Sequence, residues 1–182
     1  ADNGVVAQGV TQTGSEITAL VAKNLTIGQS CVCRMARLAR CDVIPVDVGV
    51  RTDVEAPGLW NRKIAYGTED LSQRPAMSRR QAEQAVMVGI ELIWQLKELG
   101  YKIIATGEMG IGNTTTAAAV SAALLGLPAR QATGRGAGLS TPALERKIQV
   151  VEQALSLHKP TPQDPMDVLS KVGGLDIAGM TG

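Results

Sequence analysis

The chain has 182 residues, with 18 basic and 17 acidic side chains and a hydrophobic content of 45%. This balance is typical of one globular domain over residues 1–182 and argues against nucleic acid as a partner. No apolar run approaches the roughly 18 residues that a membrane span needs, and no leader peptide is recognised, so we expect a cytoplasmic protein with no membrane association.

The first predicted elements are helical. Apolar residues recur at mostly helical spacing over 15–39 with a break near Gly28, which predicts two helices or one kinked helix. Cys31, Cys33 and Cys41 fall in or just after this stretch, and their spacing, with a single His in the chain, matches no usual zinc ligand set. We therefore expect reduced thiols in the core and no metal site.

A short buried strand is predicted over Asp42–Gly49, where Pro45 indicates an edge or a bulge. Asp47 lies near the C-terminal end of this strand. Its carboxylate could bind a ribose hydroxyl there or simply cap the following loop. The stretch Val50–Arg74 is rich in turn formers and charges, so we interpret it as a long surface excursion with Lys63–Tyr66 as its one strand candidate.

Ser78 is a good N-cap for a helix whose apolar stripe ends at Leu99. A buried strand is predicted next, over Lys102–Thr106, followed by a glycine loop over Gly107–Gly112. An alanine-rich helix then runs to a stop at Gly126. Because alanine side chains are small, we expect this helix to approach the sheet closely.

A second glycine loop covers Ala132–Leu139, and Thr141 and Pro142 start another helix. Several prolines separate that helix from a last helical pair. Strands that alternate with helices of these lengths predict the α/β class, with a parallel-sheet, three-layer, Rossmann-like core. In such sheets ligands bind outside the carboxyl ends of the strands, where Asp47 and Glu108 would fall.

The stretch from Gly107 to Thr116 carries the strongest functional signal. Glycines let the backbone approach a ligand, and a helix that opens with Asn and Thr presents N–H groups to an anion. Glu108 would repel a phosphate at contact distance, so we expect it to face another part of the same ligand. The loop lacks the Lys-Ser/Thr pair of a P-loop, and its glycine order reverses the dinucleotide fingerprint. A tight turn with a capped helix is the alternative, and Gly134–Gly138 alone could be a mobile linker.

Several segments together resemble the nicotinate-nucleotide:dimethylbenzimidazole phosphoribosyltransferase family, which makes the lower nucleotide loop of cobalamin. They are Glu108–Thr115, Gly134–Leu139, Lys147, Asp167–Gly174, Asp2–Val5 and Pro75–Arg79. The resemblance runs from end to end of the chain. It implies transfer of the phosphoribosyl group of nicotinate mononucleotide to dimethylbenzimidazole with inversion to an α-glycosidic bond, release of nicotinate, no cofactor and, as in the family, a possible homodimer.

The resemblance also implies roles for individual residues. Glu108 is expected to act as a second acid or base, and Lys147 to compensate negative charge in the active site. The substrate-binding residues expected are Gly107, Met109, Gly110, Gly112, Asn113, Thr114, Thr115, Gly134, Arg135, Gly136, Gly138 and Asp47. The family's principal general base, a Glu in a downstream glycine-rich motif, has no match here, nor has the helical segment that precedes Asp2. The resemblance thus implies a central fragment of the family's large domain.

Two other functions stay open at this point. The missing general base is compatible with a non-catalytic nucleotide-binding module. An oxidoreductase domain that binds a dinucleotide is a weaker hypothesis, because the glycine order is reversed and no clear ribose-binding acid follows a first β-α turn.

Overall fold

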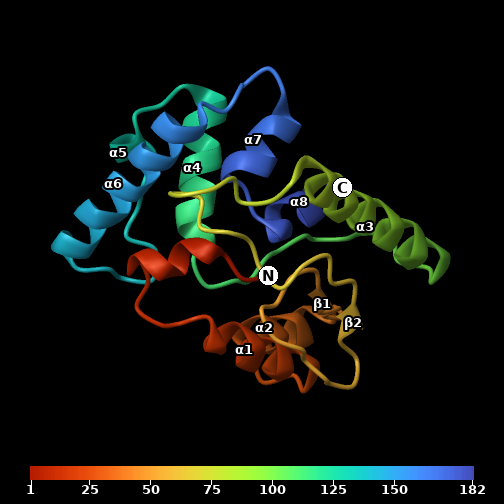
Figure 1. Cartoon of the computed structure of the whole chain (residues 1–182). Helices are drawn as coiled ribbons and strands as arrows, with labels where there is room; N and C mark the ends of the chain where they lie inside the picture. Colours follow the sequence, from red (N-terminus) through yellow and green to blue (C-terminus); the bar gives the residue numbers. More distant parts are fainter.

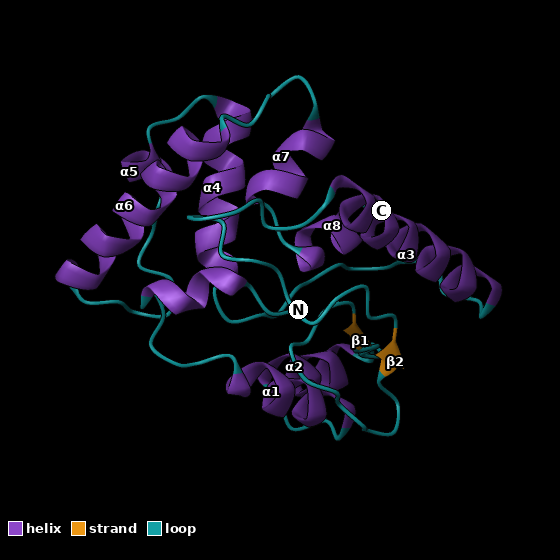
Figure 2. Ribbon diagram, viewed as in Figure 1, coloured by secondary structure: helices purple, strands orange, loops and turns teal.

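Helices make up most of the fold, and the computed structural model describes all residues of the chain (Figures 1 and 2). In chain order the elements are the short 3-10 helix η1 (Gly4–Gln8), α1 (Glu16–Thr26), α2 (Cys31–Ala39), β1 (Val46–Asp47), β2 (Trp60–Asn61), α3 (Arg79–Glu98), α4 (Asn113–Leu125), α5 (Ala129–Ala132), α6 (Thr141–His158), α7 (Pro165–Val172) and α8 (Leu175–Thr181).

The helix boundaries follow the capping residues of the sequence. The Ser78 hydroxyl accepts from the Gln81 N–H and the Gln81 side chain accepts from the Ser78 N–H, which forms a capping box at the start of α3. Gly126 ends α4 in the left-handed conformation, at φ +63°. α6 begins at Thr141 as predicted, and the Ser140 hydroxyl caps it by accepting from the Ala143 N–H. The first helical stretch is two helices, α1 and α2, separated at Gly28 with φ +74°.

The helices pack in two groups. α4 contacts α5, α6 and α7, whereas α3 lies along α8 and contacts α7 (Figure 1). A Cβ on Gly89 of α3 would overlap the carbonyl oxygen of Gly179 in α8, so only glycine permits this approach. The alanine-rich α4 was expected to pack on the sheet, and that prediction is wrong. Its buried face, which includes Ala118 and Ala119, packs against other helices instead.

The hydrophobic core is aliphatic and lies chiefly between helices. Val5 of η1, Val151 of α6, Val168 of α7 and Leu175 of α8 are completely buried and belong to one continuous cluster. Burial of such side chains contributes about 1.5–3 kcal/mol each. The segment at the N-terminal end of the chain and the C-terminal helices therefore share one core.

The sheet consists of two short parallel strands. β1 pairs with β2 in the register Val46 to Trp60 and Asp47 to Asn61. The strand predicted over residues 42–49 is thus limited to the two residues of β1. Within the stretch Val50–Arg74 the strand is β2, and the prediction of a strand at Lys63–Tyr66 is wrong. The α/β class with parallel strands is confirmed, although the sheet within this chain is small.

The segment Lys102–Thr106 is not a strand in this structure. It is extended chain at the surface, and the side chain of Ile103 is 90% exposed. None of the backbone N–H or C=O groups over residues 102–108 takes part in a backbone hydrogen bond. The prediction of a buried strand is wrong here because no neighbouring strand pairs with this segment.

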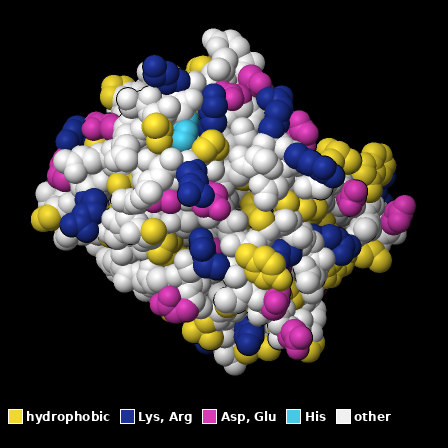
Figure 3. All heavy atoms as spheres, in the orientation of Figure 1, with side chains coloured by type: hydrophobic (Ala, Val, Ile, Leu, Met, Phe, Trp, Pro, Cys, Tyr) yellow, Lys and Arg dark blue, Asp and Glu magenta, His cyan; other side chains and the backbone are white.

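The surface carries charges of both signs. Figure 3 shows basic and acidic side chains intermingled over the visible face, with hydrophobic side chains gathered over α3. The exposed apolar residues of α3 include Met87 and Trp94. No helix combines the length and the apolarity that crossing a membrane requires.

Candidate functional site

The glycine loop is fixed against the N-terminal segment by close backbone packing. A Cβ on Gly110 would overlap the carbonyl oxygen of Ala1, and Gly112 has φ +92° with the Asn3 side chain 3.1 Å from its Cβ position. Both positions therefore require glycine, whereas nothing lies within 4 Å of the corresponding position at Gly107. The loop reaches α4 with Gly112 as N-cap, which has no side chain to cap the helix.

A polar network supports this loop from beneath. The Thr18 hydroxyl of α1 accepts from the Ile111 N–H at 3.2 Å and donates to Asp2 at 2.6 Å. The Asn3 side chain donates to Asp176 of α8 at 3.3 Å. Sequence reasoning missed Thr18 and Asp176. The available signal at Thr18 was a hydroxyl beside the apolar positions of a helix.

Glu108 is held by Asn113, the first residue of α4. Both carboxylate oxygens accept from the Asn113 Nδ2 group, at 2.8 and 2.9 Å. Glu108 is exposed as a whole residue, but partial burial of its carboxylate raises the pKa of this group. The Asn113 hydrogen bond lowers that pKa, the charge of Asp176 raises it further, and the Ala1 amino group lowers it. The group is therefore an acid whose protonated form is favoured relative to an ordinary Glu.

Lys147 lies on α6 and is 1% exposed. Its Nζ donates to the Thr114 hydroxyl of α4 at 2.7 Å, and no carboxylate lies within ion-pair distance of it. Burial lowers its pKa. A buried ammonium with one hydroxyl partner and no counter-ion keeps two further N–H donors, with which it could bind an anionic ligand.

The second glycine loop closes over this ammonium. Gly136 has φ +57°, and a Cβ there would lie 2.8 Å from the Thr114 hydroxyl oxygen and 3.3 Å from Lys147 Nζ. The Arg135 guanidinium donates to the Leu139 carbonyl at 2.8 Å, which holds the loop in its folded form. This loop is therefore part of the site, and these contacts favour a structural role over that of a linker.

These elements line one pocket of about 160 Å³. Its lining joins the loop before α4, the second glycine loop, Lys147 and a segment near the N-terminal end: Val10, Thr11, Gln12, Thr13, Ile111, Gly112, Asn113, Thr114, Arg135, Ala137, Leu139 and Lys147. Gln12 ties two of these parts together because its side chain donates to the Gly138 carbonyl at 2.8 Å. Of the predicted substrate-binding residues, Gly112, Asn113, Thr114 and Arg135 line the pocket directly.

The remaining predicted residues surround the pocket or lie elsewhere. Gly107, Glu108 and Met109 lie on the loop outside the pocket lining. Thr115 is completely buried within α4, with no hydrogen-bond partner for its hydroxyl. Gly110 packs under the loop. Gly134 belongs to the second loop, and nothing lies within 4 Å of a Cβ placed on it.

Asp47 is not brought to the pocket. It is 2% exposed, and its Oδ1 accepts from the N–H groups of Gly49 and Val50 at 2.9 and 2.7 Å. Its Oδ2 pairs with Lys63 at 3.0 Å. Asp47 therefore caps the following loop, as the alternative interpretation predicted. Both of its carboxylate oxygens have partners within the chain, so neither is free to bind a ribose hydroxyl.

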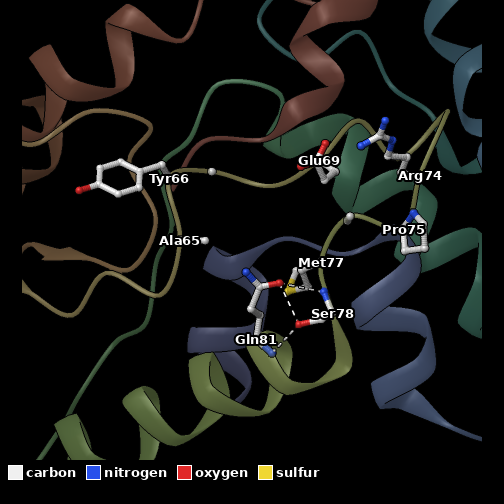
Figure 4. Close-up of a pocket in the computed structure, with 10 residues that line it drawn as sticks. Ala65, Tyr66, Glu69, Arg74, Pro75, Met77, Ser78 and Gln81 are labelled. Carbon is white, nitrogen blue, oxygen red and sulfur yellow. Dashed lines mark hydrogen bonds between the residues drawn. The ribbon is translucent and has the colours of Figure 1, made fainter.

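A second hollow lies beside the start of α3 (Figure 4) and has a volume of about 570 Å³. The labelled polar side chains do not converge on a ligand position. Ser78 and Gln81 are bonded to each other in the capping box, and Glu69 and Arg74 stand on the opposite wall. The hollow has no buried, unsatisfied charge comparable to Lys147.

A further expectation concerned the cysteines. All three are free, but only Cys33 is buried, whereas Cys31 and Cys41 are exposed. The expectation of core thiols therefore applies to one of the three. No group of three or more His, Cys, Asp or Glu side chains is arranged to hold a metal ion.

The fold and the pocket together define an α/β protein whose small pocket contains a buried lysine without a carboxylate partner. A family model described as phosphoribosyltransferase matches residues 1–182, and the chain belongs to that family.

Curated relatives and solved structures agree with this assignment. The chain is 46% identical over 182 residues to a nicotinate-nucleotide–dimethylbenzimidazole phosphoribosyltransferase of Ruminiclostridium cellulolyticum, and 49% identical over 183 residues to one of Chloroflexus aggregans. Each match covers 100% of this chain and 52% of the relative. The crystal structure of CobT from Thermus thermophilus superposes with a TM-score of 0.93 at 41% identity, covering 98% of this chain and 54% of that one. The chain thus spans about half the length of the relatives that it matches.

Proposed function

We propose that this chain contributes the nucleotide-phosphate half of an active site that transfers the phosphoribosyl group of nicotinate mononucleotide to dimethylbenzimidazole. The products are α-ribazole 5′-phosphate and nicotinate, and the reaction belongs to cobalamin assembly in the cytoplasm. The relatives named above carry this activity in their names. The buried Lys147 without a counter-ion is the observation that carries the proposal, because it needs an anionic ligand in the same pocket.

The phosphate of the mononucleotide is proposed to lie between Lys147 and the start of α4. That helix has 13 residues, so the positive end of its dipole adds to the field of the ammonium. The second glycine loop, through Gly136, keeps the space above the ammonium narrow. Such a fixed phosphate handle would hold the sugar in line for displacement at its anomeric carbon.

Glu108 is proposed to face the reacting end of the ligand. In the reaction the bond between the anomeric carbon and the nicotinate nitrogen breaks, a bond to a benzimidazole nitrogen forms, and the benzimidazole loses its N–H proton. A carboxyl group with a raised pKa can assist as an acid or base in that transfer. Thr11–Thr13 and Ile111 line the same pocket, and we propose that the aromatic base binds near them.

The test is to incubate the chain with nicotinate mononucleotide and dimethylbenzimidazole, to look for α-ribazole 5′-phosphate by chromatography, and to measure mononucleotide binding by calorimetry. Product supports the transferase. Binding without product favours the second candidate, a non-catalytic nucleotide-binding module. Absence of both overturns the proposal. Size-exclusion chromatography of the same sample tests whether the chain forms the proposed homodimer.

A further inference from the structure

Two consecutive residues at the start of α4 each hold a charged side chain: one contacts Glu108, on the loop just outside the pocket lining, and the other contacts Lys147, which lines the pocket. The Asn113 side chain holds both carboxylate oxygens of Glu108, at 2.8 and 2.9 Å. The Thr114 hydroxyl accepts from Lys147 Nζ at 2.7 Å. The Glu108 carboxylate on the loop and the Lys147 ammonium on α6 are thus both hydrogen-bonded to the first turn of α4.

The amide of Asn113 has one possible orientation. Its Oδ1 accepts from the Thr114 N–H at 2.8 Å, so its Nδ2 must point at Glu108. The reverse orientation would place the amide oxygen against a carboxylate and the amide N–H groups against a backbone N–H, and both contacts are repulsive. The bond to the Thr114 N–H also satisfies one of the free donors of the helix start.

We propose that Asn113 is a positioning residue, which locks the Glu108 carboxylate to the first turn of α4 and so sets its distance from the ammonium that Thr114 holds. This role replaces the substrate contact that the sequence predicted for Asn113, since its amide oxygen and its amide nitrogen are both engaged within the chain. The use of Glu108 as an acid or base rests on the proposed function, whereas the clamp itself does not.

The chemistry of the position favours Asn over related residues. Asp would place a second carboxylate against Glu108. Ser has a single hydroxyl, which is too short to donate to the Glu108 carboxylate while it also accepts from the Thr114 N–H. A neutral donor holds the carboxylate without removing its charge. The Asn113 hydrogen bond lowers the pKa of Glu108 against the opposing effects of burial and Asp176, so it also limits how far that pKa rises.

Nuclear magnetic resonance can detect this clamp without any substrate. At 19.0 kDa the chain suits titration of the side-chain carboxyl carbons of its Glu residues, with Glu108→Gln identifying the Glu108 signal. The side-chain amide signals of Asn113 are expected to shift with the same midpoint as the Glu108 carboxyl, and to stop shifting in Glu108→Gln. In Asn113→Ala the Glu108 midpoint is expected to move to higher pH, and in Asn113→Asp to move further.

A matched control is Asn61→Ala, which removes an exposed asparagine whose side chain bonds to a loop N–H far along the chain from α4. It should leave the Glu108 midpoint unchanged. Thr114→Val removes the hydroxyl under Lys147 and should likewise leave the Glu108 midpoint in place while it lowers the pKa of Lys147. Asn113 amide signals that ignore the Glu108 titration, or an unchanged Glu108 midpoint in a folded Asn113→Ala variant, would overturn the proposal.

Discussion

Replacing Lys147 by Met tests the anion site directly, because Met keeps much of the length of the side chain and removes its charge. An ammonium donates three hydrogen bonds, and Thr114 accepts one of them, at 2.7 Å. Two donors therefore remain for a ligand phosphate. At about 1.5 kcal/mol for each hydrogen bond to a charged group, their loss costs about 3 kcal/mol, which corresponds to a dissociation constant roughly 150-fold weaker.

Calorimetry with two ligands separates this effect from general damage to the pocket. Nicotinate mononucleotide should lose affinity for Lys147→Met by that factor, whereas the corresponding riboside, which lacks the phosphate, should bind the variant and the parent equally. Lys97→Met is the control, because Lys97 is an exposed residue of α3 that stacks over Trp94 at 4.9 Å from its ring centre. A mononucleotide affinity for Lys147→Met within twofold of the parent would refute the placement of the phosphate.

The same variant has an expected effect on stability. Burial lowers the pKa of Lys147 in the folded protein, so folding favours its neutral form. The stability of the fold is therefore highest above the ordinary lysine pKa, where the side chain is neutral in both states, and it decreases as the pH falls through the folded value. At neutral pH the protein therefore carries the cost of burying the ammonium. Lys147→Met should raise the midpoint of thermal unfolding at pH 7, and a lowered midpoint would show that the ammonium is satisfied within the protein.

Three further changes have expected outcomes. Gly136→Ala places a side chain at φ +57° with its Cβ 2.8 Å from the Thr114 hydroxyl, so it should destabilise the chain by about 1 kcal/mol in urea unfolding and weaken mononucleotide binding. Asp47→Ala leaves the largely buried Lys63 unpaired and should cost about 3 kcal/mol in the same assay, with binding unchanged. Because the pKa of Glu108 is raised in the folded protein, its stability contribution is present below the ordinary Glu pKa of about 4.3 and is lost as the pH rises through the folded value. Glu108→Gln removes this contribution, so the melting temperature should depend less on pH above about 4.3 in the variant than in the parent. An equal slope in parent and variant would contradict the burial of that carboxylate.

The helices could be predicted from the sequence because their signals are local. Ser78 with Gln81 three residues later is sufficient for a capping box, and Gly126 supplies the left-handed residue that ends α4. Each of these signals acts within one turn of the chain. No knowledge of distant contacts was needed.

The strands could not be predicted in the same way. Lys102–Thr106 has the composition of a buried strand, yet a strand exists only where a second strand supplies hydrogen bonds, and none does so here. The prediction of a strand over Lys63–Tyr66 is wrong for another reason. The Lys63 ammonium turns inward to Asp47 and to the Val50 and Thr52 carbonyls, at 3.0, 2.6 and 2.8 Å, and this fixes a loop.

The candidate site was predictable in part. The glycine loop before α4 stands out in the sequence because Asn and Thr follow its glycines at a helix start. Lys147 has no such signal, since a lysine within the long helix α6 is expected to be solvent-exposed until the fold buries it. Only the family resemblance selected it. Asn113 was selected as a ligand contact, and its bond to Glu108 depends on a loop conformation that spacing alone does not specify.

Asp47 and Lys147 show why burial by itself does not identify a functional charge. Both are almost fully buried, at 2% and 1% exposed. Asp47 receives two backbone N–H bonds and an ion pair, so each of its oxygens is satisfied and its role is to hold a loop. Lys147 has one hydroxyl partner and no carboxylate, and burial lowers its pKa. The protein thus places a lysine without a carboxylate partner where a pocket opens. Its charged form costs stability, and the proposed phosphate would offset that cost on binding.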